Sequence, residues 1–306
     1  MSTRMRVNFA YMTSCRWVDC SSGSLLESLT HELRAGTSRF SRRFDLVAVL
    51  CDDNDEEYRR AWENGPLWPG DLDVPTVDGE GRLHRQTIES LTFRISSGTW
   101  RPLKPNPSEP FAIYERRKAR AKARYERSLL RRLDGVSADL ILIDSYLPII
   151  GPDLLKAFRG RILNVHPAIS ELGDPLRLPG RHPTRDTYTR AAFGIVIVDD
   201  KRRVGIPDGA RVLVECDGVV REAVEVGKSR ESGVSVHVVT DTIDSGPVIA
   251  CDRYVLSEYQ VSMAGIRRKN QMIKKRLVPR ALLAYTDRLD VQRMIREARE
   301  RRFFPT

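Results

Sequence analysis

The stretch Arg161-Ile162-Leu163-Asn164-Val165-His166-Pro167 decides how this chain is read. Its apolar residues predict a short buried strand of the kind found in parallel sheets. Asn164 and His166 stand two residues apart at the end of that strand, so both side chains are expected on one face of the sheet. Because ligands of open α/β sheets bind at the carboxyl ends of the strands, the stretch predicts a polar site there.

A second stretch, from Ser235 to Pro247, adds an acid to this pair. Asp244 precedes a Ser-Gly pair in the turn between two apolar runs, and Asp241 is the nearest alternative to it. An Asn amide can donate to a developing oxyanion, a His can move a proton, and a nearby Asp favours the charged His. His237 lies inside a strand pattern, where packing and function are both open. The combination predicts acyl transfer through a tetrahedral adduct.

The rest of the chain alternates between period-two and helical patterns. Strands are expected at Arg6–Tyr11, Phe44–Cys51, Val74–Val77, Asp139–Ile143, Arg161–Val165, Gly194–Val198, Val234–Val239 and Pro247–Tyr254. Helices are expected after residue 24, with leucines at helical spacing, and at Phe111–Leu133, Pro152–Phe158 and Thr184–Ala192. Asp217-Gly218 predicts a hairpin between Arg211–Glu215 and Val219–Val226. The fold class is therefore α/β, a mostly parallel twisted sheet with helices on both faces, plus a β-hairpin insertion and C-terminal helices.

We expect one α/β domain over residues 1–256, with insertions at about 53–108 and 199–230. Pro, Gly, Trp and charged residues crowd the first insertion, which is expected to be irregular. Residues 257–306 form a basic, helical extension, and Pro279 is expected to split it into two helices.

Composition narrows the class of protein. The hydrophobic share of 41% is enough for a core, so global disorder is not expected. The start of the chain lacks a signal-peptide pattern, and no run of 18 apolar residues predicts a membrane span. Five scattered cysteines argue against a disulfide framework and show no zinc-site spacing, so we expect reduced thiols, no metal and a cytoplasmic location.

The motifs together resemble those of folate-dependent formyltransferases. The Asn164-Val165-His166-Pro167 strand end, the Leu178-Pro179-Gly180 loop and the stretch from Ser235 to Ile249 each match a motif of that family. The resemblance covers roughly residues 112–255 well and the N-terminal strand and helix loosely. It implies the glycinamide ribonucleotide formyltransferase type of fold and 10-formyltetrahydrofolate as the formyl donor.

The resemblance also implies a set of site residues. The catalytic residues would be Asn164, His166 and Asp244. The residues that bind the folate cosubstrate would be Tyr146, Leu147, Ile149, Val239, Thr240, Asp241 and Ile243. Those near the acceptor would be Ser22, Gly23, Ser24, Pro179, Gly180 and His182, with His182 also a candidate for the folate entrance.

Two departures from the family pattern concern the acceptor. Pro148 stands where glycinamide ribonucleotide enzymes carry an Arg that contacts the substrate carboxylate, and the region from Asp199 to Arg230 is enlarged. A similar layout is found in the enzyme of siderophore biosynthesis that formylates N5-hydroxyornithine. We therefore expect a small amine or hydroxylamine acceptor, with glycinamide ribonucleotide and water, the latter giving formyltetrahydrofolate hydrolysis, as alternatives.

The net charge of +10 leaves one alternative of another class, a basic nucleic-acid-binding protein built on this fold. The basic helix at 116–132 has few interleaved aromatic residues, so a solvated face or attraction of the folate glutamyl tail is preferred to nucleic acid. The basic C-terminal helices could pack against a second copy of the chain.

Overall fold

A computed structural model describes residues 5–14, 22–52, 72–77, 83–95, 106, 108–146, 148–180, 182–198, 209–216 and 218–303. The chain divides into two compact units. One comprises Met1–Leu163 with Leu283–Thr306, and the other comprises Asn164–Leu282.

The first unit is a parallel α/β layer. Its elements are β1 (Val7–Thr13), α1 (Ser22–Ala35), α2 (Arg39–Arg43), β2 (Phe44–Asp52), β3 (Asp73–Val77), β4 (Leu83–Thr87), β5 (Thr92–Ile95), α4 (Phe111–Gly135), β6 (Leu140–Asp144), α5 (Pro152–Ala157), the start of β7 (Ile162–His166), the end of α7 (Met263–Thr286) and α8 (Leu289–Phe303). Its main strands have the order β7-β6-β1-β2-β5. β1 is parallel to both β2 and β6, and β2 is parallel to β5.

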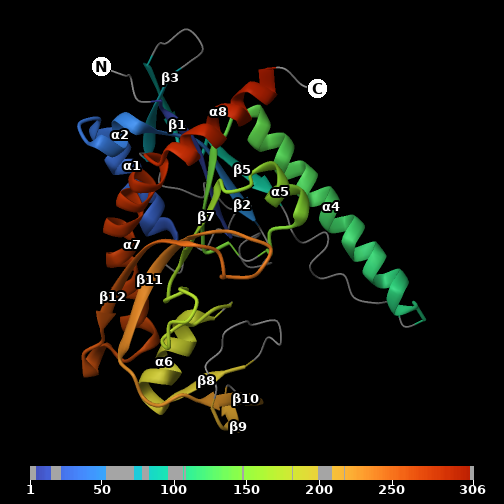
Figure 1. Ribbon diagram of the computed structural model, residues 1–306, viewed down its shortest axis with the longest axis vertical. Coiled ribbons are helices and arrows are strands. Elements are labelled where there is room, and N and C mark those ends of the chain that lie inside the picture. Colours follow the sequence, from blue (N-terminus) through green and yellow to red (C-terminus); the bar gives the residue numbers. More distant parts are fainter. Residues whose placement is uncertain are drawn as a thin grey trace. The chain divides into compact units, whose positions relative to one another are not determined.

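Burial explains the continuous apolar strands of this unit. Every residue of β6 is buried, as expected for a strand covered on both faces. In Figure 1, α1 and α2 lie on one side of β1 and β2, whereas α4 and α5 lie on the other. The leucines of α1 at positions 25, 26, 29 and 33 are all buried, which confirms the helical spacing. The predicted fold class is confirmed here.

The second unit begins inside β7, whose last three residues are Asn164, Val165 and His166. It contains α6 (Pro183–Phe193), β8 (Ile195–Ile197), β9 (Arg211–Cys216), β10 (Val219–Glu225), β11 (Glu231–Val238), β12 (Val248–Val255), a 3-10 turn (Glu258–Gln260) and most of α7. β11 lies beside β7 and pairs antiparallel with β12. β8, β10 and β9 form a separate antiparallel sheet, so the predicted hairpin is confirmed.

Three expectations were wrong. The helix does not break at Pro279 but continues to Thr286, because buried apolar residues on both sides of the proline hold it despite the lost hydrogen bond. Within 53–108 the described residues are not irregular: β3 and β4 form a two-stranded sheet, and β5 joins the main sheet. Cys51 is disulfide-bonded, whereas reduced thiols were expected. The expected domain limits, 1–256 and 257–306, remain a prediction.

Candidate active site

The end of β7 places two polar side chains together. Strand alternation turns Asn164 and His166 to one face, while Val165 between them is 1% exposed on the other. His166 is buried and Asn164 is half-buried. Pro167 follows, and its missing N–H suits the end of a strand. The predicted shared face is confirmed, because both side chains reach the same carboxylate.

That carboxylate belongs to Asp244, in the loop between β11 and β12. Asp244 has a φ of 49°, the left-handed conformation that Asp adopts more readily than most residues. Two residues later, a Cβ on Gly246 would lie 1.8 Å from the Val238 carbonyl oxygen, so only glycine lets the loop approach β11 this closely. Buried Arg177 holds the loop through the Asp244 carbonyl, at 2.8 Å, and the Ser245 hydroxyl, at 3.1 Å.

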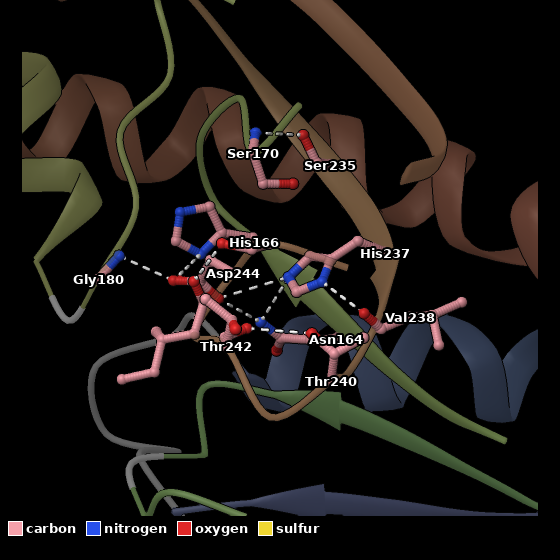
Figure 2. Close-up of polar contacts among 12 residues, drawn as sticks. Asn164, His166, Ser170, Gly180, Ser235, His237, Val238, Thr240, Thr242 and Asp244 are labelled. Carbon is pink, nitrogen blue, oxygen red and sulfur yellow. Dashed lines mark hydrogen bonds and ion pairs between the residues drawn. The ribbon is translucent and has the colours of Figure 1, made fainter. Parts of the chain in front are cut away.

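Four groups surround the Asp244 carboxylate (Figure 2). The Gly180 backbone N–H donates to Oδ2 at 2.7 Å, and the Asn164 amide donates to Oδ1 at 3.4 Å. His166 Nδ1 is 3.7 Å from Oδ2, and His237 Nε2 is 3.4 Å from Oδ1. Asp244 therefore links the strand end, the Pro-Gly loop and β11 in one polar cluster.

The electrostatics of this cluster keep Asp244 ionised. Burial opposes its charge, but His166, a hydrogen bond and charge from His237 and the Gly180 N–H together hold the pKa of Asp244 well below its usual range. A carboxylate with these partners stays negative at neutral pH. The site thus holds a fixed negative charge beside two groups that can carry protons.

Hydrogen bonds to carbonyl oxygens fix the orientation of both rings. His166 Nε2 lies 2.8 Å from the Leu178 carbonyl oxygen, which can only accept, so Nε2 carries a proton and Nδ1 faces Asp244. His237 Nδ1 likewise donates to the Val238 carbonyl oxygen at 3.1 Å. Its Nε2 then faces Asp244 and the Asn164 amide, 3.2 Å away. Each ring therefore turns one exchangeable nitrogen towards the same carboxylate.

His237 and Arg177 are site residues that sequence reasoning did not select. The sequence was consistent with either a packing or a functional role for His237, and its contact with the Asn164 amide places it in the candidate site. The sequence did contain a signal for His237, because it stands two residues after Ser235 and so shares its strand face. In the structure the Ser235 hydroxyl accepts the Ser170 N–H at 3.1 Å (Figure 2). Arg177 gave no signal, because its contact with the Asp244 carbonyl joins residues that are 67 positions apart in the chain.

The residues predicted near the acceptor are placed differently from one another. Gly180 contacts Asp244, and Pro179 is buried beside it in the same loop. His182 caps α6, where its backbone carbonyl accepts the Asp186 N–H at 3.0 Å. The segment from Ser22 to Ser24 is not a loop but the first turn of α1, whose side chains lie outside the described part of the chain.

The residues predicted to bind folate fall into two groups. Val239, Thr240 and Ile243 are partly exposed and Asp241 is exposed, in the loop that ends with Asp244. In the first unit, the Tyr146 hydroxyl is hydrogen-bonded to that of Tyr125, and Ile149 is 42% exposed. Leu147 lies outside the described residues. Their role in folate binding remains a prediction.

No group of three or more His, Cys, Asp or Glu side chains among the described residues is arranged to hold a metal ion. No helix among them is both long and apolar enough to cross a membrane.

Parts of the chain are similar to known formyltransferases. The family model "Formyl transferase" matches residues 98–190. Phosphoribosylglycinamide formyltransferase of Escherichia coli (strain K12) is 23% identical over 188 residues, covering 58% of this chain and 69% of the relative. The same enzyme of Bacillus subtilis (strain 168) is 25% identical over 150 residues, covering 49% of this chain and 55% of the relative.

Solved structures share the fold. PvdF, an N10-formyltetrahydrofolate-dependent formyltransferase of pyoverdin biosynthesis, aligns with a TM-score of 0.66 and 20% identity over 92% of this chain and all of the other. Glycinamide ribonucleotide transformylase 1 of Symbiobacterium toebii aligns with a TM-score of 0.51 and 17% identity over 94% of this chain and 88% of the other. The chain therefore carries a formyl transferase segment at residues 98–190 and resembles formyltransferases in sequence and fold. The matched segment includes Asn164, His166 and Gly180, whereas His237 and Asp244 lie beyond it.

Proposed function

We propose that this chain transfers a formyl group from 10-formyltetrahydrofolate to the nitrogen of a small amine or hydroxylamine. The observation that carries the proposal is the ionised Asp244 carboxylate, which has one amide and two imidazole nitrogens within 3.7 Å. The formyltransferase relatives and the fold shared with PvdF support the donor and the class of reaction. An acceptor of specialised metabolism is proposed, with N5-hydroxyornithine of siderophore biosynthesis as the first candidate.

Asn164 would stabilise the adduct. Attack by the acceptor nitrogen on the formyl carbon gives a tetrahedral adduct whose oxygen carries negative charge, and an un-ionised amide N–H can donate to it. The Asn164 amide now donates to Asp244 across 3.4 Å, a long hydrogen bond that costs little to replace. His237 holds the same amide at 3.2 Å and would act as a positioning residue.

His166 and Asp244 would manage the protons. The attacking nitrogen must lose a proton and N10 of the folate must gain one, so the net transfer is balanced without an external acid or base. His166 Nε2 is committed to the Leu178 carbonyl, so exchange takes place at Nδ1, which faces Asp244. The Asp244 charge favours the imidazolium form that results.

Two acceptors within the same chemistry are alternatives. Glycinamide ribonucleotide is supported by the bacterial phosphoribosylglycinamide formyltransferases that the chain resembles. Pro148, in place of an Arg, supports a different acceptor. Water, giving formate, remains the alternative that needs no amine. A cytoplasmic location also stays a proposal.

The test is an acceptor screen with 10-formyltetrahydrofolate, in which release of tetrahydrofolate and of formate is followed. Amines, hydroxylamines including N5-hydroxyornithine, and glycinamide ribonucleotide are compared with donor alone. His166→Ala is expected to lose about 10²–10⁴-fold in turnover. His31→Ala is the matched control, because the His31 side chain is 61% exposed on α1 and is expected to leave turnover unchanged. Full turnover by His166→Ala, or formate release that no acceptor changes, would overturn the proposal.

A further inference from the structure

A pocket of about 160 Å³ lies in the first unit, at the amino ends of β6 and β7. It is lined by the ends of α4 and α5, the residue before β7 and the end of α8 (Figure 1), all of which belong to this unit. Its charged lining consists of Asp134, Arg161, Arg301 and Arg302, and alanine and phenylalanine side chains form the rest. Asn164 and His166 stand at the other end of β7, so the pocket is not part of the candidate active site.

The lining of this pocket carries an excess of positive charge. Three arginines against one aspartate, Asp134, leave the lining with a net charge of +2. Arg161 is only 4% exposed, so solvent screens its charge poorly. Burial and then the charge of Arg302 lower the pKa of Arg161 to about 10, and Arg301 adds to this shift, whereas Asp139 and Asp134 oppose it. An anion bound in the pocket would relieve the repulsion among the three guanidinium groups.

The three guanidinium groups also retain N–H donors for a ligand. Arg161 donates to two backbone carbonyl oxygens, at 2.8 Å and 2.6 Å, which uses two of its five N–H groups. Arg302 donates to one carbonyl oxygen and lies 3.9 Å from Asp139, a carboxylate that already accepts hydrogen bonds from Arg299. Arg301 is exposed and makes no hydrogen bond or ion pair with another residue that the structure describes.

These features favour a phosphate group as the ligand. A guanidinium presents its N–H groups as a fork that matches two phosphate oxygens, and such charge-assisted hydrogen bonds are stronger than neutral ones. A phosphate group carries close to two negative charges at neutral pH and so balances the lining, whereas a carboxylate supplies only one. The pocket has room for several water-sized groups, so the four oxygens of a phosphate fit in it.

We propose that Arg161, Arg301 and Arg302 bind a phosphate group in this pocket. Its source is inorganic phosphate or a small phosphate monoester, which present the same group to the arginines. The ligand would join α8 to the amino end of β7, because two of the arginines lie on α8 and the third directly precedes the strand. The inference does not depend on the proposed function, since no residue that contacts Asp244 takes part.

The test is isothermal titration calorimetry of the full chain with inorganic phosphate, glycerol 3-phosphate and acetate, in a phosphate-free buffer of low ionic strength. Wild type is compared with Arg301→Gln and Arg302→Gln, which remove guanidinium donors, and with Asp134→Asn, which removes the carboxylate from the lining. Arg296→Gln is the control for the arginine variants, because Arg296 is exposed on α8 and does not line the pocket. Asp290→Asn, at the start of α8, is the control for Asp134→Asn, because the Asp290 side chain is 60% exposed.

Wild type is expected to bind at least one of the two phosphate compounds roughly tenfold or more tightly than acetate. Arg302→Gln and Arg301→Gln should each weaken this binding by about three- to tenfold, and Asp134→Asn should tighten it by about threefold. Both controls should change it by less than about twofold. Binding of inorganic phosphate alone would identify the free ion as the ligand, and binding of glycerol 3-phosphate would extend the ligand class to phosphate monoesters; either result supports the site.

A purely structural role of the arginines, in which they only hold backbone carbonyl groups, would lower the melting temperature of the variants while wild type bound neither phosphate compound. That result would overturn the inference. Acetate binding as tight as phosphate binding, unchanged affinity in both pocket arginine variants, or an equal loss of affinity in Arg296→Gln would overturn it as well. Tetrahydrofolate release in the acceptor screen is measured separately, so the two proposals fail independently.

Discussion

Asp139 and Asp244 are both buried carboxylates, one in each unit, yet their partners differ in kind. Asp139 is fully buried and accepts two hydrogen bonds from the Arg299 guanidinium, one of 2.9 Å, and a third from the Asn8 backbone N–H at 2.9 Å. Arg302 lies 3.9 Å away. Asp244 instead receives backbone, amide and imidazole groups.

We infer that the difference separates a structural carboxylate, Asp139, from one proposed to take part in the reaction, Asp244. An arginine is always charged, so the Asp139 pair is permanent and fastens α8 to the amino end of β6. An imidazole changes its charge near neutral pH, so the partners of Asp244 can exchange protons during a reaction. Burial alone would not distinguish the two aspartates.

The largest expected effect comes from Asn164, the asparagine whose amide donates to Asp244. Under the proposed mechanism Asn164→Ala removes the amide that would donate to the adduct, and turnover with the acceptor found in the screen should fall about 10²–10³-fold. Asn8→Ala is the matched control, because the hydrogen bonds of Asn8 to Asp139 are made by its backbone N–H and carbonyl, which the substitution keeps. Steady-state release of tetrahydrofolate measures both. Equal losses of turnover in the two variants would contradict the proposed difference between Asp244 and Asp139.

Asp139→Asn should act on stability instead. It leaves the Arg299 guanidinium, a third exposed, without its charge partner and is expected to cost about 2–3 kcal/mol in the free energy of unfolding. Urea denaturation gives this value, and turnover per folded molecule should stay at the wild-type level. A loss of turnover without a loss of stability would assign Asp139 a role that its partners do not suggest.

A smaller effect is expected at His237. His237→Gln keeps an amide near Nε2 but loses the ring that orients Asn164, so kcat should fall about tenfold while KM for the folate donor stays unchanged. Initial rates at varied donor concentration give kcat and KM separately. A raised KM with unchanged kcat would make His237 a binding residue and not a positioning one.

The smallest effect concerns acid stability. Because the folded state lowers the pKa of Asp244, its charge stabilises the protein above the unfolded pKa of about 3.9, and this stabilisation is lost as the pH falls below that value. Wild type should exceed Asp244→Asn by on the order of 1 kcal/mol at pH 7, and the gap should close below about pH 4. Thermal unfolding at a series of pH values measures this difference in stability. A difference that does not change with pH would contradict the claim that the Asp244 charge stabilises the fold.

The site could be predicted in part from the sequence. Alternation along one short strand places Asn164 and His166 on one face, and family resemblance supplies Asp244. His237 was left open because a histidine in a buried strand is also consistent with packing. The role of Arg177 and the Tyr11–Asp144 contact could not be predicted from the sequence, because loop closure and the register of parallel strands depend on residues far apart in the chain. The predicted helix break at Pro279 was wrong, because the packing of α7 outweighs the tendency of proline to end a helix.

The most direct test of the account is single-turnover formyl transfer by wild type and Asp244→Asn, with saturating donor and the acceptor found in the screen. We predict that the variant binds 10-formyltetrahydrofolate as wild type does but releases tetrahydrofolate at least about 100-fold more slowly. Equal single-turnover rates would contradict the claim that the Asp244 carboxylate, with Asn164 and His166, carries the reaction.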